Sequence, residues 1–228
     1  MTDQSVLRPK QQIQGVIMDL KLVPQDKTST RPKRDNGRPK QILNAAIELF
    51  CDHGYEATRL EDVAGRAGVS KATIYLYFES KEDLLFALIR ENIVPVVEQS
   101  INQMENFSGA SSDFLRMKAK SLGPLMLHSN HGAILKLVIS EARRFPEIAD
   151  YFRAEVPERA LGNLAKLIQK GIDTGEFREC DPKAMAAAFM FPLLMNGIWA
   201  NSIGPHEIVD GDALITAHLE NFLRGLLP

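Results

Sequence analysis

The sequence predicts an all-α fold, and two observations carry this prediction. From Pro39 to the C-terminus, apolar residues recur three or four positions apart, which is the spacing of one helix face. No alternating apolar and polar run of useful length, the pattern of a half-buried strand, occurs in the sequence. Glycine, proline, serine and threonine separate the periodic segments, as they do at helix ends. We therefore expect three short helices followed by a helical bundle.

Composition bounds the class of protein. The chain has 228 residues, of which 45% are hydrophobic and 25% charged, as in ordinary soluble domains. This length suits one large domain or two small ones. Two cysteines are too few for a disulfide framework, and we see neither an apolar run of membrane-spanning length nor a secretory leader. We expect a cytoplasmic protein without membrane contact.

Charge is distributed unevenly along the chain. Residues 1–81 hold 13 Lys/Arg and 10 Asp/Glu, a net of +3, whereas residues 82–228 hold 14 and 19, a net of −5. Such asymmetry suggests that the N-terminal part faces nucleic acid. Residues 1–37 predict a flexible basic arm, which is either a solvated leader or an added contact to DNA phosphates or the minor groove. Met18 is an alternative start to Met1.

Residues that are typical of helix starts and ends divide the segment after residue 37 into three short helices. The first helix stops at Gly54, because glycine takes the left-handed conformation freely. Thr58 and Glu61 predict a capping box at the start of a second helix. Ser70, after a glycine turn, is a favourable N-cap for a third helix over residues 71–77.

Two short helices joined by a glycine turn indicate a helix-turn-helix. On the third helix, Ile74 and Phe78 are four positions apart and are expected to face the core. The N-terminal residues of such a helix reach base edges in the major groove, and a small side chain such as Ala72 permits close approach. The predicted DNA-contacting residues are Arg38, Lys40, Thr58, Arg59, Ser70, Lys71, Ala72, Thr73, Tyr75, Tyr77 and Lys81.

A long fourth helix is predicted over residues 81–105, capped by Ser80. Pro95 lies inside it and removes a backbone donor, so we expect a kink there. The kink either bends the helix around the core or is the point at which two conformations of this helix differ. Further helices are expected near 111–129, 131–144, 146–174, 181–203 and 211–226.

Residues 42–85, "ILNAAIELFCDHGYEATRLEDVAGRAGVSKATIYLYFESKEDLL", resemble the DNA-binding domain of the TetR (tetracycline repressor-like) family of bacterial transcription regulators. Arg59 departs from the threonine or serine that is more usual there. The positions that carry the resemblance are Phe50, Gly54, Thr58, Ala64, Ala67, Gly68, Val69, Ser70, Thr73, Tyr75, Tyr77, Phe78, Lys81 and Leu84.

This resemblance implies a DNA-binding domain over residues 38–82 and an effector-binding and dimerisation domain over residues 83–228. It also implies a homodimer through about 181–203 and 211–226, a palindromic operator in double-stranded DNA, and usually repression. A small, largely apolar effector would fit the many apolar and methionine side chains of the C-terminal part, although core and interface packing is the more usual role of such side chains. The candidate effector contacts are Val97, Ile101, Met117, Met126, Phe152, Phe189, Met195 and Trp199.

Other chemistry has little support in the sequence. His128 and His131 have a spacing compatible with a metal on a helix, but Gly132 suggests a helix break and no carboxylate or cysteine cluster is adjacent. No hydrolase, phosphate-loop, dinucleotide or zinc-protease motif occurs, so we expect no enzyme, metal or cofactor. Two hypotheses remain besides an unsupported helical enzyme: a ligand-responsive repressor, and a DNA-binding protein whose C-terminal part only dimerises or docks a protein.

Overall fold

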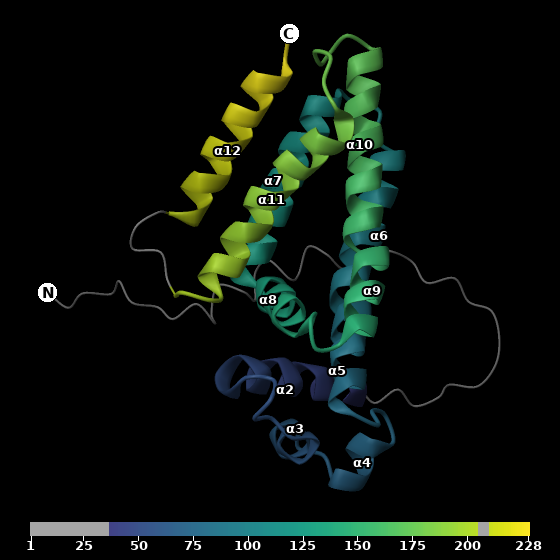
Figure 1. Cartoon of the computed structure of the whole chain (residues 1–228), viewed down its shortest axis with the longest axis vertical. Helices are drawn as coiled ribbons and strands as arrows, with labels where there is room; N and C mark the ends of the chain where they lie inside the picture. The colour runs from purple at the N-terminus through teal and green to yellow at the C-terminus, as the bar shows by residue number, and fades with distance from the viewer. Residues whose placement is uncertain (1–36, 205–209) are drawn as a thin grey trace, which may run out of the picture. The chain divides into compact units, whose positions relative to one another are not determined.

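The computed structural model describes residues 37–204 and 210–228, and this part of the chain is helical and holds no strand (Figure 1). The all-α prediction is confirmed. Apart from Gly37, the predicted arm over residues 1–37 lies outside the described residues. The helices are α2 (Arg38–His53), α3 (Leu60–Ala67), α4 (Lys71–Tyr75), α5 (Lys81–Leu88), α6 (Val94–Glu105), α7 (Ser111–His128), α8 (His131–Glu141), α9 (Pro146–Glu155), α10 (Pro157–Asp173), α11 (Pro182–Ala200) and α12 (Gly211–Leu226).

The local signals of the helix-turn-helix act largely as predicted. Gly54 ends α2 at φ 81°, and its N–H donates to Phe50 O. Gly68 makes the turn between α3 and α4 at φ 67°, a conformation that favours glycine. The Ser70 hydroxyl accepts from the Thr73 N–H at 3.1 Å, and Ser80 caps α5 in the same way. Helix α4 is shorter than predicted and ends at Tyr75.

The predicted capping box at Thr58 is wrong by one residue. Thr58 is only 2% exposed, and its hydroxyl donates to Gly54 O at 2.8 Å, satisfying a carbonyl at the end of α2. Helix α3 begins after Arg59 instead, where the Asp62 carboxylate accepts the Arg59 backbone N–H at 3.0 Å. Asp62 therefore takes the capping role that was predicted for Glu61, and the Glu61 side chain is available for other contacts.

Proline explains two departures from the predicted helices. Between α5 and α6 the chain stays helical but widens into a π-helical turn (Ile89–Ile93), which places Pro95 in the first turn of α6, where its missing N–H costs least. The predicted helix over 146–174 is two helices, α9 and α10, which meet at Val156 with φ −115° and ψ −80°. Pro157 follows Val156, and the residue before a proline is disfavoured in the α conformation.

Two buried clusters hold the described residues together, and residues 37–228 cluster as one compact unit. The head core is formed by α2 to α5, the π-helical turn, Val94, α8 and Ile148 of α9. The body core is formed by α7, α10, α11 and α12, with Phe177. The head core therefore crosses residue 82, since α8 supplies Ala133, Ile134, Leu137 and Val138 to it.

Helix α11 corrects one expectation from composition. Among the described residues it is long and apolar enough to cross a membrane by length and hydropathy alone, whereas we saw no such run in the sequence. In the structure it packs against α7, α8, α10 and α12, as the core helix of a bundle does. Packing therefore accounts for part of its apolar composition, while Phe191, Met195 and Trp199 remain exposed.

Candidate nucleic-acid interface and ligand cavity

Helix α4 divides its side chains between core and surface as predicted. Ile74 is fully buried and Phe78, just beyond the helix, is nearly so; both belong to the head core. Lys71, Ala72, Tyr75 and Tyr77 are exposed. The buried pair fixes the helix against α2 and α3, which leaves a rigid outer surface of the kind that a major groove accepts.

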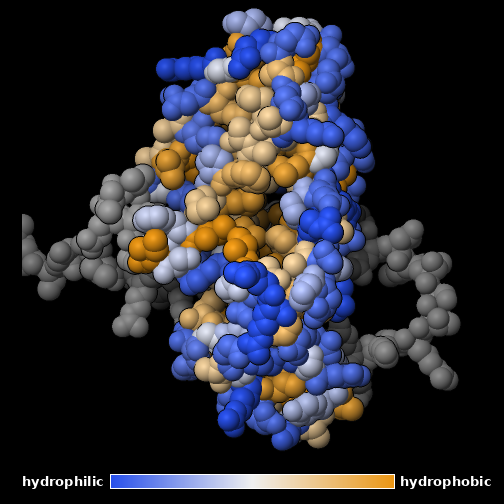
Figure 2. Space-filling view, viewed as in Figure 1, coloured by the Kyte–Doolittle hydropathy of each residue, from blue (hydrophilic) through white to orange (hydrophobic). Residues whose placement is uncertain are grey.

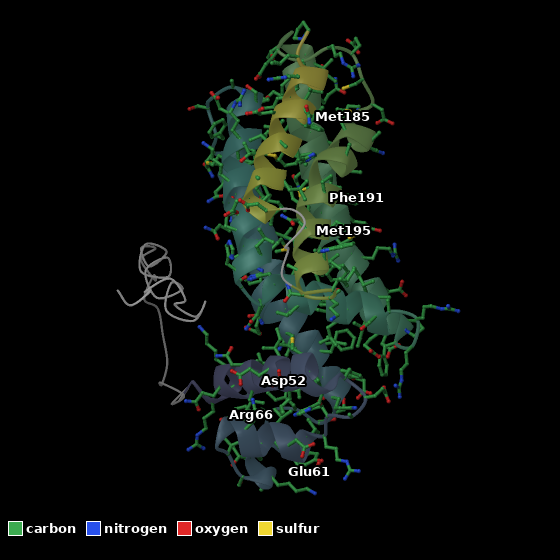
Figure 3. The ribbon with its side chains drawn as sticks, turned by 90° about the vertical axis from the view of Figure 1, so that its left-hand side faces the viewer. Asp52, Glu61, Arg66, Met185, Phe191 and Met195 are labelled. Carbon is green, nitrogen blue, oxygen red and sulfur yellow. The ribbon has the colours of Figure 1, made fainter. Side chains whose placement is uncertain are left out.

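Glu61 of α3 organises this surface, and the sequence analysis did not identify it as a site residue. Its carboxylate lies 2.6 Å from Lys71 Nζ and accepts a hydrogen bond from the Tyr75 hydroxyl at 3.3 Å. The hydrogen bond from Lys71 is the main reason that the pKa of Glu61 is lowered. Two predicted DNA contacts are thus held in place by a neighbouring acid. Figure 3 shows Glu61 at the α3–α4 end of the molecule.

Leu76 is the second residue that the sequence analysis missed. It is 82% exposed between Tyr75 and Tyr77, so it takes no part in the head core. An apolar side chain on a surface that is predicted to face DNA is suited to contact with the thymine methyl group in the major groove. Its position two residues after buried Ile74 could have indicated the outer face.

Several other predicted DNA contacts also have structural partners. The Lys81 ammonium donates to Tyr55 O at 2.8 Å and Glu56 O at 3.1 Å, so it braces the loop between α2 and α3. Thr58 is buried and its hydroxyl bonds to the Gly54 carbonyl, so it does not reach the surface as a phosphate contact would require. The Thr73 hydroxyl bonds with the Ser70 hydroxyl at 2.8 Å. The remaining predicted contacts, Arg38, Lys40 and Arg59, are exposed.

Replacing Glu61 with glutamine should tighten binding to non-specific duplex DNA and steepen its salt dependence. The change removes a negative charge from the surface and frees Lys71 for a phosphate, which adds about 0.9 to the slope of log affinity against log salt. Fluorescence anisotropy over a salt series measures both quantities. Glu105→Gln, at the other end of the α5–α6 rod, is the matched control and should change neither. An unaltered slope in Glu61→Gln would show that Lys71 does not reach phosphate.

A cavity of about 350 Å³ lies among α6, α7, α8, α10 and α11, within the usual size range of small-molecule sites. Its lining is almost wholly apolar. Figure 2 shows hydrophobic side chains gathered about a hollow in the middle of the face drawn. Of the predicted effector contacts, Val97, Ile101, Met126, Phe152 and Met195 line it.

Three predicted effector contacts do not line the cavity. Met117 is exposed on the outer side of α7, and Trp199 is also largely exposed. Phe189 is fully buried in the body core, with its ring centroid 5.3 Å from that of Phe222 on α12. Helix α11 is apolar on all sides, so its sequence could not distinguish the side facing the cavity from the side facing α12.

The cavity also holds two basic side chains that the sequence analysis did not assign to it, Lys118 and His131. His131 Nε2 lies 3.2 Å from Asn92 O in the π-helical turn, and Nδ1 lies 2.6 Å from Ser129 Oγ. Because a carbonyl can only accept, Nε2 carries the proton. Burial lowers the pKa of His131. Across the described ranges no three His, Cys, Asp or Glu side chains gather as metal ligands.

The cavity touches both cores. Ile93, at the end of the π-helical turn, belongs to the head core, and Phe114, Leu122 and Met190 belong to the body core. A molecule bound here would contact the π-helical turn that follows α5, and also the bundle. The fold and these two sites define a helix-turn-helix regulator with a ligand-sized cavity in its helical C-terminal part.

Comparisons with known proteins agree with this description. The model for "Bacterial regulatory proteins, tetR family" matches residues 42–88, and the model for "AefR-like transcriptional repressor, C-terminal domain" matches residues 113–209. The HTH-type transcriptional regulator YdeS of Bacillus subtilis is 30% identical over 64% of this chain and 70% of its own length. The chain belongs to the TetR family, a family of DNA-binding transcription regulators rather than enzymes.

Two further similarities cover most of the chain. The fatty acid metabolism regulator protein of Bacillus subtilis is 26% identical over 83% of this chain and 96% of its own length. The solved structure of the fatty acid degradation regulator FadR from Bacillus halodurans superposes with a TM-score of 0.64 at 24% identity, covering 82% of this chain and 98% of the other. The second similarity supports the fold alone.

Proposed function

We propose that this protein is a homodimeric repressor that binds a palindromic operator through α4 and is released by a small, largely apolar effector. One observation carries the proposal: a ligand-sized cavity touches both the core that holds the recognition helix and the core of the bundle. A ligand that prefers one arrangement of the two cores changes the spacing of the recognition helices in the dimer. By linkage, DNA then opposes that ligand to the same extent.

An exposed apolar stripe on α11 supports the homodimer. Phe191 and Met195, which also line the cavity, are 58% and 56% exposed, and Trp199 continues the row at the same four-residue spacing. Ile203, in the turn that follows α11, is also exposed. Figure 3 shows Phe191 and Met195 along α11. A row of large apolar side chains on one face is typical of a surface that a partner covers, and a second copy supplies the same row by symmetry. The row falls within the interface expected over 181–203 and 211–226.

Cavity chemistry and similarity to known proteins support the effector. Most lining residues are aliphatic, aromatic or methionine side chains, which suit an apolar molecule. The similar proteins named above are called regulators of fatty acid metabolism and degradation. We propose further that residues 1–37 add phosphate contacts to the operator complex, that the division at residue 82 separates DNA binding from effector binding, and that the protein is cytoplasmic.

Operator binding tests the proposal directly. Selection from random duplexes with the purified protein should yield a palindrome whose half-site centres are one helical turn apart, about 34–36 Å. Lys71→Ala and Tyr77→Ala should each weaken binding to that operator about five- to 150-fold. Lys170→Ala, an exposed lysine on α10, is the control and should bind as the parent does.

Two results would contradict parts of this proposal. If both α4 variants bind as tightly as the parent at matched salt, α4 is not the recognition helix. If no apolar small molecule stabilises the protein in a thermal-shift screen, effector release gives way to the second hypothesis, in which the C-terminal part only dimerises or docks a protein. A duplex containing one half-site should bind much more weakly than the palindrome if the protein acts as a dimer.

A further inference from the structure

One face of α7 lines the cavity, and a lysine stands in the middle of it. Phe114, Lys118, Leu122 and Met126 are spaced by four residues, so they follow one another along the same side of the helix. The other three are among the buried residues of the body core. The lysine thus replaces one apolar member of a stripe that faces an apolar space.

The Lys118 ammonium has no partner among the residues that the structure describes. No hydrogen bond or ion pair joins it to any residue in 37–204 or 210–228. No aspartate or glutamate is among the residues that line the cavity. Glu98, on the neighbouring helix α6, lies instead 3.5 Å from Arg159. Both ring nitrogens of His131 are engaged, as described above. Within the described part of the chain, the cavity therefore contains a cation without a counter-charge.

Burial of this cation is unfavourable for the empty protein. It lowers the pKa of Lys118 to about 8, because an ammonium loses hydration in an apolar environment. A methionine or leucine at this position would complete the stripe without that cost. Residues that reduce stability in this way are typical of sites that bind something.

We propose that the ligand of this cavity is an anionic amphiphile, whose apolar body fills the lining and whose acidic group pairs with the Lys118 ammonium. The inference rests on the proposed function, because it requires that the cavity bind a ligand at all. A charge-assisted hydrogen bond in an apolar environment is short and strong, and it would give the Lys118 ammonium the partner that it lacks among the described residues. The neutral Ser100 and Asn163 side chains are the other polar groups available in the lining. Cationic ligands of the same size are disfavoured by like charge.

Binding of a matched series tests the proposal. Decanoate, decyl sulfate, decanol and decyltrimethylammonium share one apolar chain and differ in the head group. Titration calorimetry at pH 7, below the critical micelle concentrations, gives the affinity of each for the full-length protein. We expect the two anions to bind about ten- to a hundredfold more tightly than decanol, and the cation more weakly than decanol. Equal affinity for both anions would show that Lys118 recognises charge rather than carboxylate shape.

Two variants separate the role of the charge from that of the fold. Lys118→Met should reduce decanoate affinity to that of decanol, leave decanol binding unchanged, and raise the melting temperature of the ligand-free protein. Lys120→Met, an exposed lysine two residues further along α7, should behave as the parent in all three measurements. A raised melting temperature also shows that the variant is folded.

The outcomes distinguish the two proposals. If decanol and decanoate bind the parent equally, or if Lys118→Met keeps the preference for the anion, the inference about Lys118 is wrong while the cavity remains a binding site. If none of the four compounds binds and no apolar compound stabilises the protein in the thermal-shift screen, the effector part of the proposed function fails together with this inference.

Discussion

Replacing Phe189 with alanine should lower the free energy of unfolding by about 3–5 kcal/mol, the usual cost of emptying a buried aromatic site. Phe189 has no exposed surface, and its ring packs against Phe222. His218 of α12 also lies 2.9 Å from its backbone carbonyl through Nε2. The side chain therefore attaches α12 to α11. Urea denaturation at fixed protein concentration measures the change.

Met117→Ala is the matched control, because Met117 was also predicted to contact an effector and does not line the cavity. It is exposed on α7, so its removal should change the free energy of unfolding by no more than about 0.5 kcal/mol. A Phe189→Ala variant as stable as the parent would show that α12 does not depend on this aromatic contact. Comparing the two variants also tests whether either side chain affects ligand binding.

Gly197→Leu should destabilise the protein by about 3 kcal/mol or more, at the upper end of the cost of overpacking. A Cβ at Gly197 would lie 2.7 Å from Met126 Cβ and 2.8 Å from the Met126 carbonyl oxygen, closer than such atoms approach. Because one of these contacts is backbone, α7 and α11 would have to separate. Thermal and urea unfolding measure the loss.

Gly162→Leu is the control, and it should raise the free energy of unfolding where Gly197→Leu lowers it. Gly162 lies inside α10, and a Cβ there meets nothing within 4 Å. Leucine favours the helix over glycine, so this variant should gain about 0.5–1 kcal/mol. If both variants gained stability, the close approach of α7 and α11 at Gly197 would be disproved.

The DNA-binding half could be predicted from sequence because its signals are local. Gly54, Gly68, Ser70 and Ser80 each act on backbone within a few residues, so their types and spacing define the helices. The break at Val156 was also accessible, since Pro157 follows it directly. The contacts between helices could not be predicted from sequence, and the ion pair between Glu61 and Lys71 is one of them.

The cavity was only partly predictable. Five of the eight predicted residues line it, and the three that do not were selected because they are apolar. Apolar character identifies buried or covered side chains but does not say which neighbour covers them. Lys118 went unnoticed because a lysine on a helix is ordinarily solvated, and only the structure places it among Phe114, Leu122 and Met126.

The head core has a consequence for building hybrid regulators. Exchanging residues 38–82 between two proteins would transplant α2 to α4 without α8, which packs against α2 and shares the head core. Ile134 and Val138 are buried side chains of α8 in this core, and Ile148 of α9 is fully enclosed with them. A functional chimera would have to take these positions from the same parent as residues 38–82, although they lie some fifty residues or more further along the chain. The natural unit of exchange is therefore a set of contacting side chains and not a continuous stretch of sequence.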